Sequence, residues 1–402
     1  MPAQEQPRRF RIAVVNSHPI QYFAPLYAYL QASGRFEMTA IYCTDYSIRG
    51  EVDPGFKEVV RWDLDLLSGY RSIFLRGAEG RTPRGFWSLI GLQLWSEIRS
   101  DRYDAVLIHG HQFAAYLVAM LAALVKRVPV LMRCDTHLGL RRSGMRRIFR
   151  MLVVGALYRL ADRCLAVGSA NARFYRGIGV PVRKIVVVPF AVDNDRFVAA
   201  SSITAAERDV IRTGLGVPLG KPVVLFSSKF QARKHPDHVL RAAARLRDMG
   251  IRFTVLMVGS GDMVEPLRRL AAELSLDNVV FGGFINQADL PKVYAASDVF
   301  VLPSENEPWG LIVNEVMCAG LPIVISDEVG CVADLVEDND NGLLFKAGDV
   351  DGLTDCLKRV LSDDDLRSRM GRRSRERIAQ WGYAQCLERL SAATSEFGKS
   401  TA

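Results

Sequence analysis

The chain has 402 residues, 49% of them apolar, which is enough for two hydrophobic cores because a single core stops growing near ~250–300 residues. No segment approaches the ~18–20 uninterrupted apolar residues that a membrane-spanning helix needs, and no apolar signal core follows the polar N-terminus, so we expect a cytoplasmic protein. Seven cysteines are scattered without a C-x-x-C pair, which fits neither a disulfide framework nor a zinc site.

Charge is divided unevenly along the chain, whose formal net charge is +8. Residues 1–200 hold 28 Lys and Arg against 16 Asp and Glu, whereas residues 201–402 hold 24 against 28. A basic first half is typical of a protein with an anionic partner, which is here a membrane surface, a phosphorylated acceptor or nucleic acid. A solvated basic face explains the same charge pattern equally well.

In the first half, short apolar runs alternate with segments of helical spacing. The run at 11–16 predicts a buried strand, and Tyr22, Leu26 and Tyr29 recur at helical spacing behind it. Alternating strands and helices predict βαβ units on a parallel sheet. The other strands are predicted at 36–43, 105–109, 129–134 and 163–167, and the other helices at 114–126 and 145–160.

The segment 192–222 is polar and rich in Gly and Pro, which is the composition of a connector between domains. We therefore predict a first domain at 1–195, a second at 196–380, and a C-terminal helix within 381–402 that packs back toward the first domain. Two facing, doubly wound α/β domains place the carboxyl ends of both sheets at one cleft, where such sheets bind ligands. Strands are predicted at 223–228, 253–258, 279–284, 299–302 and 322–326, and helices at 235–249, 263–274, 288–296, 311–319, 350–380 and 383–394.

The segment 299–326 reads as a buried strand, a polar loop, a helix that begins near Gly310, and a second strand. Glu307 in the loop and Glu315 inside the helix are placed to reach one ligand at the start of that helix. Their carboxylates accept hydrogen bonds from sugar or ribose hydroxyls, and the N–H groups at a helix start attract phosphate. Those N–H groups belong to Gly310, Leu311 and Ile312.

The motif Pro303-Ser304-x2-Glu307-x-Trp309-Gly310-x4-Glu315-x4-Gly320-x-Pro322 resembles the E-x7-E signature of the family 4 glycosyltransferases. The resemblance covers most of residues 222–348 and, more weakly, parts of the first half. It implies the GT-B fold and sugar transfer with retention of anomeric configuration. It also implies that Glu307 binds the transferred sugar and Glu315 the ribose of the donor. Two solvated glutamates at a helix start are the alternative.

Basic residues follow the first strand of the second domain. Lys229 and Lys234 stand where the family places an Arg and a Lys that bind the donor diphosphate. Lys229 is a departure from that pattern, because Lys is a point charge without the forked donors of Arg. Arg233 is a candidate to supply the missing fork. A solvated helix that begins with Arg233 and Lys234 is the alternative.

Two further segments of the second domain are candidates for donor contacts. Gly259 lies in a short glycine turn after a strand, which permits close approach of the backbone to a ligand. The segment 280–285 resembles the strand and turn where, in this family, backbone groups meet the nucleotide base, and it ends at Ile285. Phe284 is a candidate to flank that base and, equally, a candidate core residue.

Polar residues end two predicted strands of the first domain, where α/β sheets place ligand sites. His109 ends one strand, His111 lies two residues beyond it, and both lie on the expected acceptor side. Asp135 and His137 follow the next strand, and either is a candidate for the family's histidine near the sugar. The three histidines lack a defined third ligand, so we expect no metal site there. A structural hydrogen bond is the alternative role for His137.

The loop after the first strand and a later Arg-rich helix are the remaining candidates. His18, Gln21 and Tyr22 offer side-chain donors to acceptor or donor oxygens, where many family members have a Gly-Gly pair. The segment 141–163 combines clustered arginines with an apolar helix. This pattern is typical of a helix on an anionic membrane and, equally, of a buried crossover helix with a basic entrance.

Together these features predict a retaining glycosyltransferase that moves a sugar from a nucleotide-diphosphate sugar to an acceptor hydroxyl. The acceptor is expected to be a glycan or a lipid-linked molecule, in glycan, polysaccharide or glycolipid synthesis. No nucleic acid is expected, because no binding module or aromatic stripe accompanies the arginines. No cofactor or metal ion is expected, because preorganised cations stabilise the leaving diphosphate. The predicted catalytic residues are Glu307, Lys234, Asp135 and His137.

Three other activities are the alternatives to sugar transfer. A sugar-nucleotide epimerase of the same fold would turn over the donor without an acceptor. A non-catalytic nucleotide-sugar-binding protein would bind the donor and never consume it. A dinucleotide oxidoreductase is disfavoured, because no G-x-G-x-x-G follows the first strand.

Overall fold

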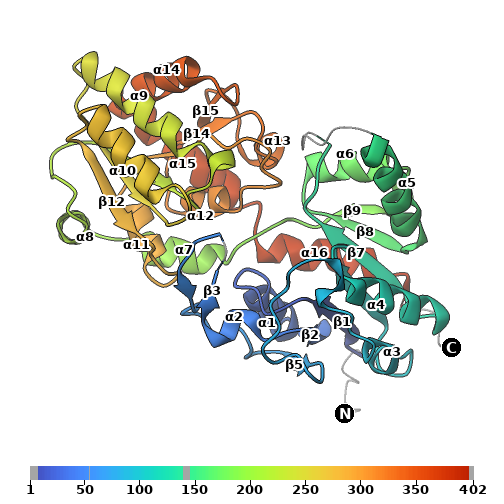
Figure 1. Ribbon diagram of the computed structural model, residues 1–402. Helices are drawn as coiled ribbons and strands as arrows, with labels where there is room; N and C mark the ends of the chain where they lie inside the picture. Colours follow the sequence, from blue (N-terminus) through green and yellow to red (C-terminus); the bar gives the residue numbers. More distant parts are fainter. Residues whose placement is uncertain (1–7, 54, 139–144, 398–402) are drawn as a thin grey trace, which may run out of the picture.

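The computed structural model describes residues 8–53, 55–138 and 145–397, with only the helical course of the chain described at 145–150. Two lobes lie side by side, each built on a parallel β-sheet flanked by helices (Figure 1). In the described part of the chain, no helix combines the length and the apolar character needed to cross a bilayer.

The N-terminal lobe contains a seven-stranded parallel sheet. Its strands are β1 (Phe10–Asn16), β2 (Phe36–Tyr42), β5 (Arg71–Phe74), β6 (Ala105–His109), β7 (Val130–Cys134), β8 (Arg163–Ala166) and β9 (Ile185–Val187). They stand in the order β5-β2-β1-β6-β7-β8-β9. The direction of winding therefore reverses between β1 and β6, which is where sheets of this kind bind ligands.

The C-terminal lobe contains a six-stranded sheet of the same design. Its strands are β10 (Val223–Ser227), β11 (Thr254–Val258), β12 (Val279–Gly283), β13 (Val299–Leu302), β14 (Ile323–Ser326) and β15 (Gly342–Phe345). They stand in the order β12-β11-β10-β13-β14-β15, so the switch point lies between β10 and β13.

Helices flank both sheets, and α7 and α8 lie between the two lobes in the chain. The helices before the connection are α1 (Ala24–Ala32), α2 (Tyr46–Arg49), α3 (Leu94–Glu97), α4 (Ala114–Val125), α5 (Met145–Leu160) and α6 (Ser169–Gly177). Those that follow are α7 (Asn194–Ser201), α8 (Ala205–Gly214), α9 (Pro236–Asp248), α10 (Val264–Glu273), α11 (Leu290–Ala295), α12 (Ile312–Cys318), α13 (Val332–Leu335), α14 (Val350–Leu361), α15 (Asp364–Ile378) and α16 (Tyr383–Thr394). Short 3-10 turns lie at Phe86–Ser88, Val182–Lys184 and Ala232–Lys234.

Alternate residues of β1 enter two different cores, because successive side chains of a strand point to opposite faces. Val14 belongs to a core with Leu26 of α1, whereas Val15 belongs to a core with Met120 of α4. Both faces of the strand are therefore buried. This explains why the strand reads as an uninterrupted apolar run rather than as an alternating one.

Two helices occupy the segment that was expected to be a polar connector. Asp193 caps α7 by accepting a hydrogen bond from the Arg196 amide at 3.0 Å. Thr204 and Glu207 form a capping box at the start of α8. The predicted domain boundary between 195 and 196 falls inside α7, which packs against α11 and α12 of the C-terminal lobe.

Other element boundaries also differ from the sequence-based expectation. The helix expected to begin near Gly310 begins at Ile312, and the closing segment 350–380 is two helices, because Asp363 caps a second one. Short elements between 44 and 104 were not predicted. They include the two-residue strands β3 (Glu51–Val52) and β4 (Val59–Val60), which form a small hairpin. Strands this short carry no readable periodicity.

The last described helix, α16, packs against α1 and β9 of the N-terminal lobe (Figure 1). Cys386 Sγ lies 3.2 Å from the Pro189 carbonyl oxygen, and Glu388 forms an exposed ion pair with Arg35 at 2.8 Å. A single hydrophobic core includes apolar side chains of both lobes and of α16. The lobes are therefore joined by shared packing as well as by the chain.

Candidate active site

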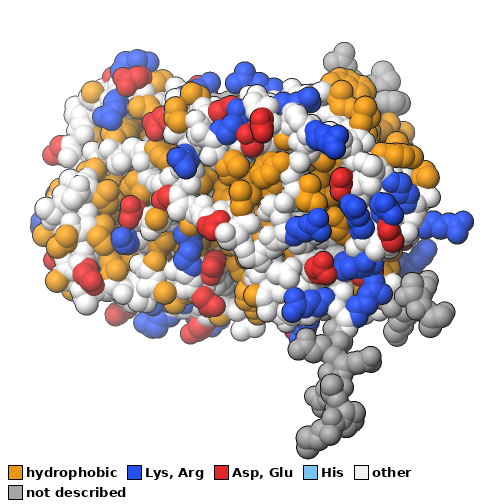
Figure 2. Space-filling model, turned by 90° about the horizontal axis from the view of Figure 1, so that it is seen from below, with side chains coloured by type: hydrophobic (Ala, Val, Ile, Leu, Met, Phe, Trp, Pro, Cys, Tyr) orange, Lys and Arg blue, Asp and Glu red, His pale blue; other side chains and the backbone are white. Residues whose placement is uncertain are grey.

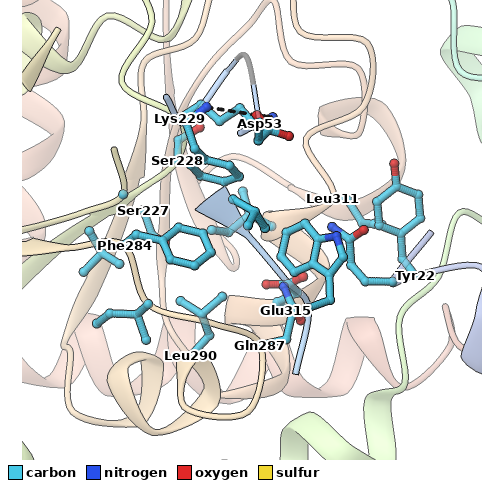
Figure 3. A pocket seen from close by; sticks show the side chains of 18 of the residues that line it. Tyr22, Asp53, Ser227, Ser228, Lys229, Phe284, Gln287, Leu290, Leu311 and Glu315 are labelled. Atoms are coloured by element: carbon cyan, nitrogen blue, oxygen red, sulfur yellow. Dashed lines mark hydrogen bonds and ion pairs between the residues drawn. The ribbon is translucent and has the colours of Figure 1, made fainter. Parts of the chain in front are cut away.

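A cavity of about 460 Å³ lies between the lobes at the carboxyl ends of strands from both sheets (Figure 3). On the C-terminal side it is lined by the segments after β10, β11, β12 and β13. On the N-terminal side it is lined by the loop after β1 and by residues around the hairpin of β3 and β4. The sequence-predicted residues that line it are His18, Gln21, Tyr22, Lys229, Arg233, Lys234, Gly259, Phe284, Ile285, Glu307, Gly310, Leu311, Ile312 and Glu315.

Glu307, the buried Lys234 and the exposed Arg233 form a polar cluster in this cavity. The Glu307 carboxylate accepts hydrogen bonds from Arg233 Nη1, at 2.8 Å, and from Lys234 Nζ. Lys234 is 7% exposed and Glu307 is 8% exposed, so both charges are nearly removed from water. Burial by itself raises the pKa of Glu307, but the charges of Lys234 and Arg233 outweigh burial and lower that pKa. Glu307 is therefore held as a carboxylate.

The pKa of the Lys234 ammonium group is also lowered, but here burial is the larger effect. Burial lowers its pKa, and the neighbouring Glu307 carboxylate opposes that shift. A buried cation of this kind needs an anionic partner, because an uncompensated buried charge is strongly destabilising. Glu307 is that partner, and Lys234 also lines the cavity, within reach of a ligand there.

Lys229 adds a third cation at the end of β10. Its Nζ lies 2.8 Å from Asp53 Oδ1, a carboxylate of the opposite lobe. Arg233 brings to the same cavity the forked guanidinium that Lys229 lacks. Three positive side chains on one side of the cavity suit a ligand with several negative charges, such as a diphosphate.

Glu315 reaches the same cavity from α12 and is buried. It accepts a hydrogen bond from the Tyr294 hydroxyl at 2.6 Å. Burial raises the pKa of Glu315 to about 7, although the Tyr294 hydrogen bond and the charge of Arg196 oppose the shift. Glu307 and Glu315 thus line one cavity from a loop and a helix, in different ionisation environments.

Two glycines let the backbone approach the cavity closely. Gly259 has φ +132°, and a Cβ there would lie 1.9 Å from the Ser228 carbonyl oxygen. Gly310 has φ +85°, and a Cβ there would lie 2.7 Å from Val329 Cγ1. Both the dihedral angle and the space therefore require glycine.

The cavity has an apolar end on the C-terminal lobe. Phe284 and Ile285 follow β12, and Leu290 begins α11. Figure 3 shows Phe284 and Leu290 on the side of the cavity away from Tyr22. An aromatic ring and aliphatic side chains at this end suit a planar, apolar part of a ligand.

The loop after β1 contributes the polar side chains of the N-terminal lobe. His18 Nδ1 lies 3.0 Å from Ser17 Oγ, and burial lowers the pKa of His18 to about 4 against the opposing charge of Asp53. His18 is therefore neutral near pH 7. Burial raises the pKa of Tyr22, whose ring packs 5.4 Å from that of Phe190.

A second cavity of about 300 Å³ lies within the N-terminal lobe, beside the main cavity. Tyr22 lines both cavities, whereas His109 and His111 line only the second. His109 is buried, its Nε2 lies 3.0 Å from the Tyr27 hydroxyl, and burial lowers its pKa well below the ordinary value. His111 Nδ1 lies 3.2 Å from the Tyr158 hydroxyl. Both histidines thus hydrogen-bond within the wall of the second cavity.

The structure separates the two candidates for the histidine near the sugar. Asp135 lines the second cavity, where removal from bulk water raises the pKa of its carboxyl and the charge of Glu307 adds to the shift. His137 lines neither of these two cavities but a third one, of about 290 Å³, and its Nε2 lies 2.9 Å from the backbone oxygen of Glu307. His137 therefore supports the loop that carries Glu307, and Asp135 is the candidate for ligand contact.

Several cavity residues of the N-terminal lobe were missed from the sequence. They lie in the little-structured stretch around β3 and β4 and include Asp53, Phe56 and Trp62. No motif surrounds them, and the strands beside them are too short for a hydrophobic pattern. Their position in the cavity follows only from the packing of the two lobes.

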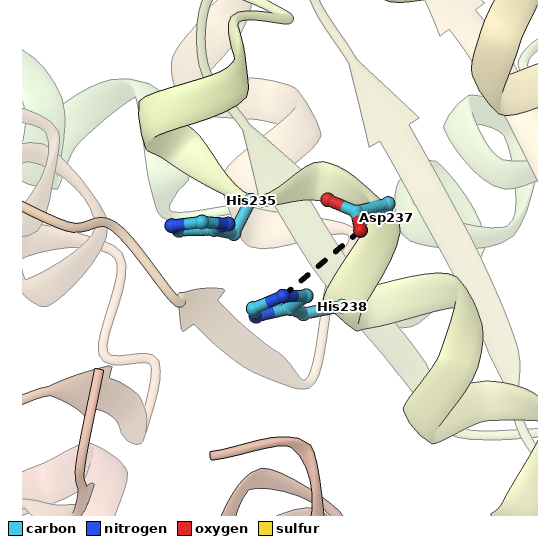
Figure 4. Close-up of side chains that lie close together, drawn as sticks. All are labelled: His235, Asp237 and His238. Atoms are coloured by element: carbon cyan, nitrogen blue, oxygen red, sulfur yellow. Dashed lines mark ion pairs between the residues drawn. The ribbon is translucent and has the colours of Figure 1, made fainter. Parts of the chain in front are cut away.

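One group of side chains outside the main cavity could hold a metal ion. The ligand atoms of His235, Asp237 and His238 lie within 4.8 Å of one another at the start of α9 (Figure 4). His235 also contacts Glu305 at 3.0 Å through its Nε2 atom. Imidazole with carboxylate is a ligand set that suits zinc, copper or nickel. The main cavity is lined by carboxylates as well, but three cations accompany them there, and cations suit anionic ligands.

Comparison with known proteins identifies the family. Residues 19–191 match the family described as Glycosyl transferase 4-like domain, and residues 207–377 match Glycosyl transferases group 1. A D-inositol 3-phosphate glycosyltransferase of Nocardia farcinica is 31% identical over 370 residues, which cover 87% of this chain and 76% of that protein. The chain belongs to the family 4 glycosyltransferases. It is therefore a transferase enzyme.

Other similar proteins agree with this family and its fold. A 2-deoxystreptamine glucosyltransferase of Streptomyces kanamyceticus is 37% identical over 275 residues, 65% of this chain and 70% of that protein. A sucrose-phosphate synthase of Thermosynechococcus elongatus has a TM-score of 0.75 at 20% identity, over 98% of this chain and all of that one. The Anabaena protein HepE in complex with UDP-glucose has a TM-score of 0.72 at 19% identity, over 96% of this chain. The two parallel-sheet lobes confirm the predicted GT-B fold.

Proposed function

We propose that this glycosyltransferase moves a sugar from a nucleotide-diphosphate sugar to an acceptor hydroxyl, with retention of anomeric configuration. The observation that carries the proposal is the convergence of three cations and the two glutamates of the motif in one cavity between the lobes. Cations offset the charge of a diphosphate, and glutamates accept hydrogen bonds from hydroxyls. The complex of the structurally similar HepE with UDP-glucose supports a donor of this class.

In the proposed arrangement the donor diphosphate lies against Lys229, Arg233 and Lys234. Glu307 accepts hydrogen bonds from hydroxyls of the transferred sugar, and Glu315 accepts them from the ribose. The cations are in place before reaction, so they stabilise the negative charge that develops as the diphosphate leaves. The remaining donor contacts are assigned to Gly259, Phe284, Ile285, Gly310, Leu311 and Ile312.

The acceptor enters from the N-terminal lobe, on the side of His18, Gln21 and Tyr22. Its hydroxyl oxygen bonds to the anomeric carbon on the face that the diphosphate leaves, which gives retention. The proton of that hydroxyl passes to the departing phosphate oxygen, so the charges balance. Asp135, which lines the second cavity, orients the transferred sugar.

We propose that the acceptor is a polyhydroxylated molecule of glycan, polysaccharide or glycolipid synthesis. The relatives named for D-inositol 3-phosphate and 2-deoxystreptamine support a hydroxyl-rich acceptor. The second cavity, lined by polar residues such as His111 and Asp135, offers space and hydrogen-bonding groups for it. Its position beside the main cavity places such an acceptor next to the transferred sugar.

A thermal-shift screen against UDP, GDP, ADP and their sugars tests the proposal, because a ligand stabilises the native state by RT ln(1 + [L]/Kd). The sugar nucleotide that shifts the transition is then incubated with acceptors, and the product is examined by NMR. Transfer with the donor's anomeric configuration supports the proposal. Donor turnover without an acceptor indicates an epimerase, and binding without consumption indicates a binding protein. Either of these results contradicts the proposal.

We also propose a peripheral contact of the N-terminal lobe with the anionic inner face of a membrane. The Arg-rich segment from Arg141 begins outside the described residues, but α5 exposes Leu152, Val153 and Leu160 to solvent. Figure 2 shows apolar side chains together with many Lys and Arg side chains at the N-terminal-lobe end of the molecule. Basic side chains and exposed apolar side chains on one lobe attract anionic lipid.

Co-sedimentation with vesicles tests the membrane contact. Vesicles of phosphatidylglycerol should carry the protein to the pellet, and vesicles of phosphatidylcholine alone should not. The substitution Leu152→Asp should weaken the binding, because it places a charge in the apolar part of the surface. Equal recovery with both lipids, or no effect of Leu152→Asp, contradicts this contact.

A further inference from the structure

A short stretch of the N-terminal lobe lies across the donor side of the main cavity. It consists of residues 51–53 and 55–63, here called the cross-lobe segment, and includes β3 and β4. Its Asp53, Phe56 and Trp62 line the cavity with residues of the C-terminal lobe. The proposed function places the whole donor on the C-terminal lobe and gives these three residues no role.

The cross-lobe segment is attached to the C-terminal lobe at several points outside the cavity. Lys57 forms an exposed ion pair with Asp262 at 3.2 Å. Asn286 Nδ2 donates a hydrogen bond to the Arg61 carbonyl oxygen at 2.7 Å, and the Ala288 amide donates to the Asp63 carboxylate. The residues next to Phe56 and Trp62 in the sequence are thus fixed against the donor-binding lobe.

Asp53 pairs with one of the cations proposed to bind the diphosphate. Its Oδ1 lies 2.8 Å from Lys229 Nζ, and Figure 3 shows this contact at the edge of the cavity. The Lys229 side chain is 34% exposed and that of Asp53 is 20% exposed, so water reaches the pair. Ion pairs that water reaches are weak. A diphosphate, which carries more negative charge than one carboxylate, therefore competes well for Lys229.

Aromatic rings adjoin this ion pair. The Phe56 ring lies 4.9 Å from the Phe284 ring in an edge-to-face arrangement, and the Trp62 ring lies 6.5 Å from it. Lys229 Nζ is 4.5 Å from the Phe56 ring. The cross-lobe segment thus places an anion and two aromatic rings beside the residues assigned to the diphosphate and the base. A nucleoside diphosphate likewise combines anionic phosphates with a planar base.

We propose that the cross-lobe segment forms the second wall of the donor site, resting on the donor site of the proposed function. Asp53 holds the position of a donor phosphate oxygen on Lys229 until the donor arrives, and Phe56 and Trp62 cover the nucleoside beside Phe284. A ligand must carry phosphate to displace Asp53, and it gains the aromatic cover only if it also carries a base. The segment therefore selects nucleoside diphosphates over free sugars and over nucleosides.

Calorimetric titrations with UDP, GDP, ADP and inorganic pyrophosphate test this inference. Asp53→Asn should bind both pyrophosphate and the preferred nucleoside diphosphate about fivefold more tightly, equivalent to about 1 kcal/mol, because the competing charge is gone. Phe56→Leu should weaken binding of the nucleoside diphosphate about tenfold, since base stacking on an aromatic ring is lost, and should leave pyrophosphate unchanged. Asp262→Asn, which removes an exposed ion pair of the same segment, should change neither affinity.

Each opposite result overturns the inference. Unchanged or weaker binding of pyrophosphate by Asp53→Asn would show that Asp53 does not compete with phosphate. Tighter binding by Asp262→Asn to the same extent would show that the segment acts only as a tether between the lobes. Equal affinity of wild type and Phe56→Leu for the nucleoside diphosphate would show that Phe56 does not cover the nucleoside. If the wild type binds no nucleoside diphosphate at all, the proposed function itself fails.

Discussion

At the scale of single residues, the two glutamates of the motif differ because of their neighbours. Both are buried, but Glu307 contacts two cations and stays ionised, whereas Glu315 contacts a tyrosine hydroxyl. The spacing of the motif predicts that both residues reach one ligand, and both line the main cavity. Spacing does not reveal the tyrosine partner, because Tyr294 lies on a different helix.

The raised pKa of Glu315 predicts a dependence of stability on pH. Its pKa rises from 4.5 to about 7 on folding, so between these values the native state keeps a proton that the unfolded chain has released. Stability from this group is complete below about pH 4.5 and falls by up to about 3 kcal/mol as the pH rises through 7. Urea unfolding of wild type and Glu315→Gln at pH 5 and pH 8 measures the difference.

Comparison of wild type with Glu315→Gln controls for the other titrating groups, because both proteins contain them. The gap in unfolding free energy between the two proteins should favour Glu315→Gln more at pH 8 than at pH 5. A gap that is the same at both values would show that Glu315 ionises normally in the native state.

The cations of the cavity predict catalysis that needs no metal ion. Lys229, Arg233 and Lys234 already supply positive charge where the diphosphate is proposed to lie. We expect EDTA to leave the transfer rate within about twofold of its value without chelator. His238→Ala, which removes a ligand from the group at the start of α9, should behave in the same way. Loss of activity with EDTA, restored by a divalent metal, would contradict this prediction.

At the scale of elements, the turn before α12 depends on a glycine in the left-handed region. Gly310→Ala combines an unfavourable φ with a Cβ that meets Val329, so we expect a loss of more than about 2 kcal/mol of stability. Gly348 has nearly the same φ, +86°, but a Cβ there would meet no atom within 4 Å, so Gly348→Ala should cost only about 1 kcal/mol. Thermal unfolding compares the two, and equal losses would show that the contact with Val329 has no effect.

Long buried strands were predicted well, because parallel strands covered on both faces read as apolar runs. Runs such as 11–16 and 223–228 correspond to β1 and β10. The helices α7 and α8 in the connector were missed, because their capping residues are polar and resemble the rest of this polar segment. The pair Thr204 and Glu207 signals the start of a helix, and a search for the capping box would have found α8.

At the scale of the whole molecule, α16 follows the C-terminal lobe in the chain and packs against the N-terminal lobe. Leu390 is buried there in the core shared by both lobes. Leu390→Ala should cost about 2–5 kcal/mol, because it leaves a cavity in that core. Arg389→Ala on the exposed side of α16 should change stability by less than about 0.5 kcal/mol. Urea unfolding measures both, and equal midpoints would show that α16 does not stabilise the lobe.

The main cavity could be predicted in part from the sequence. Its C-terminal wall carries the motif and the basic segment, so Glu307, Lys229 and Lys234 were found. Its N-terminal wall depends on how the lobes face each other, and no local pattern encodes that contact. Asp53 and Phe56 therefore became visible only when both lobes were placed.

The proposed donor site is tested most directly by the kcat/KM for sugar transfer of Lys234→Ala and Glu307→Gln. Folding of each variant is checked by circular dichroism, and Lys292→Ala, an exposed lysine of the same lobe, serves as the control. We predict a loss of at least about 100-fold for each cavity variant, because a preorganised charge contact at the reacting centre is removed, and little change for Lys292→Ala. Transfer by folded Lys234→Ala and Glu307→Gln within about twofold of the wild-type rate would contradict the proposed donor site.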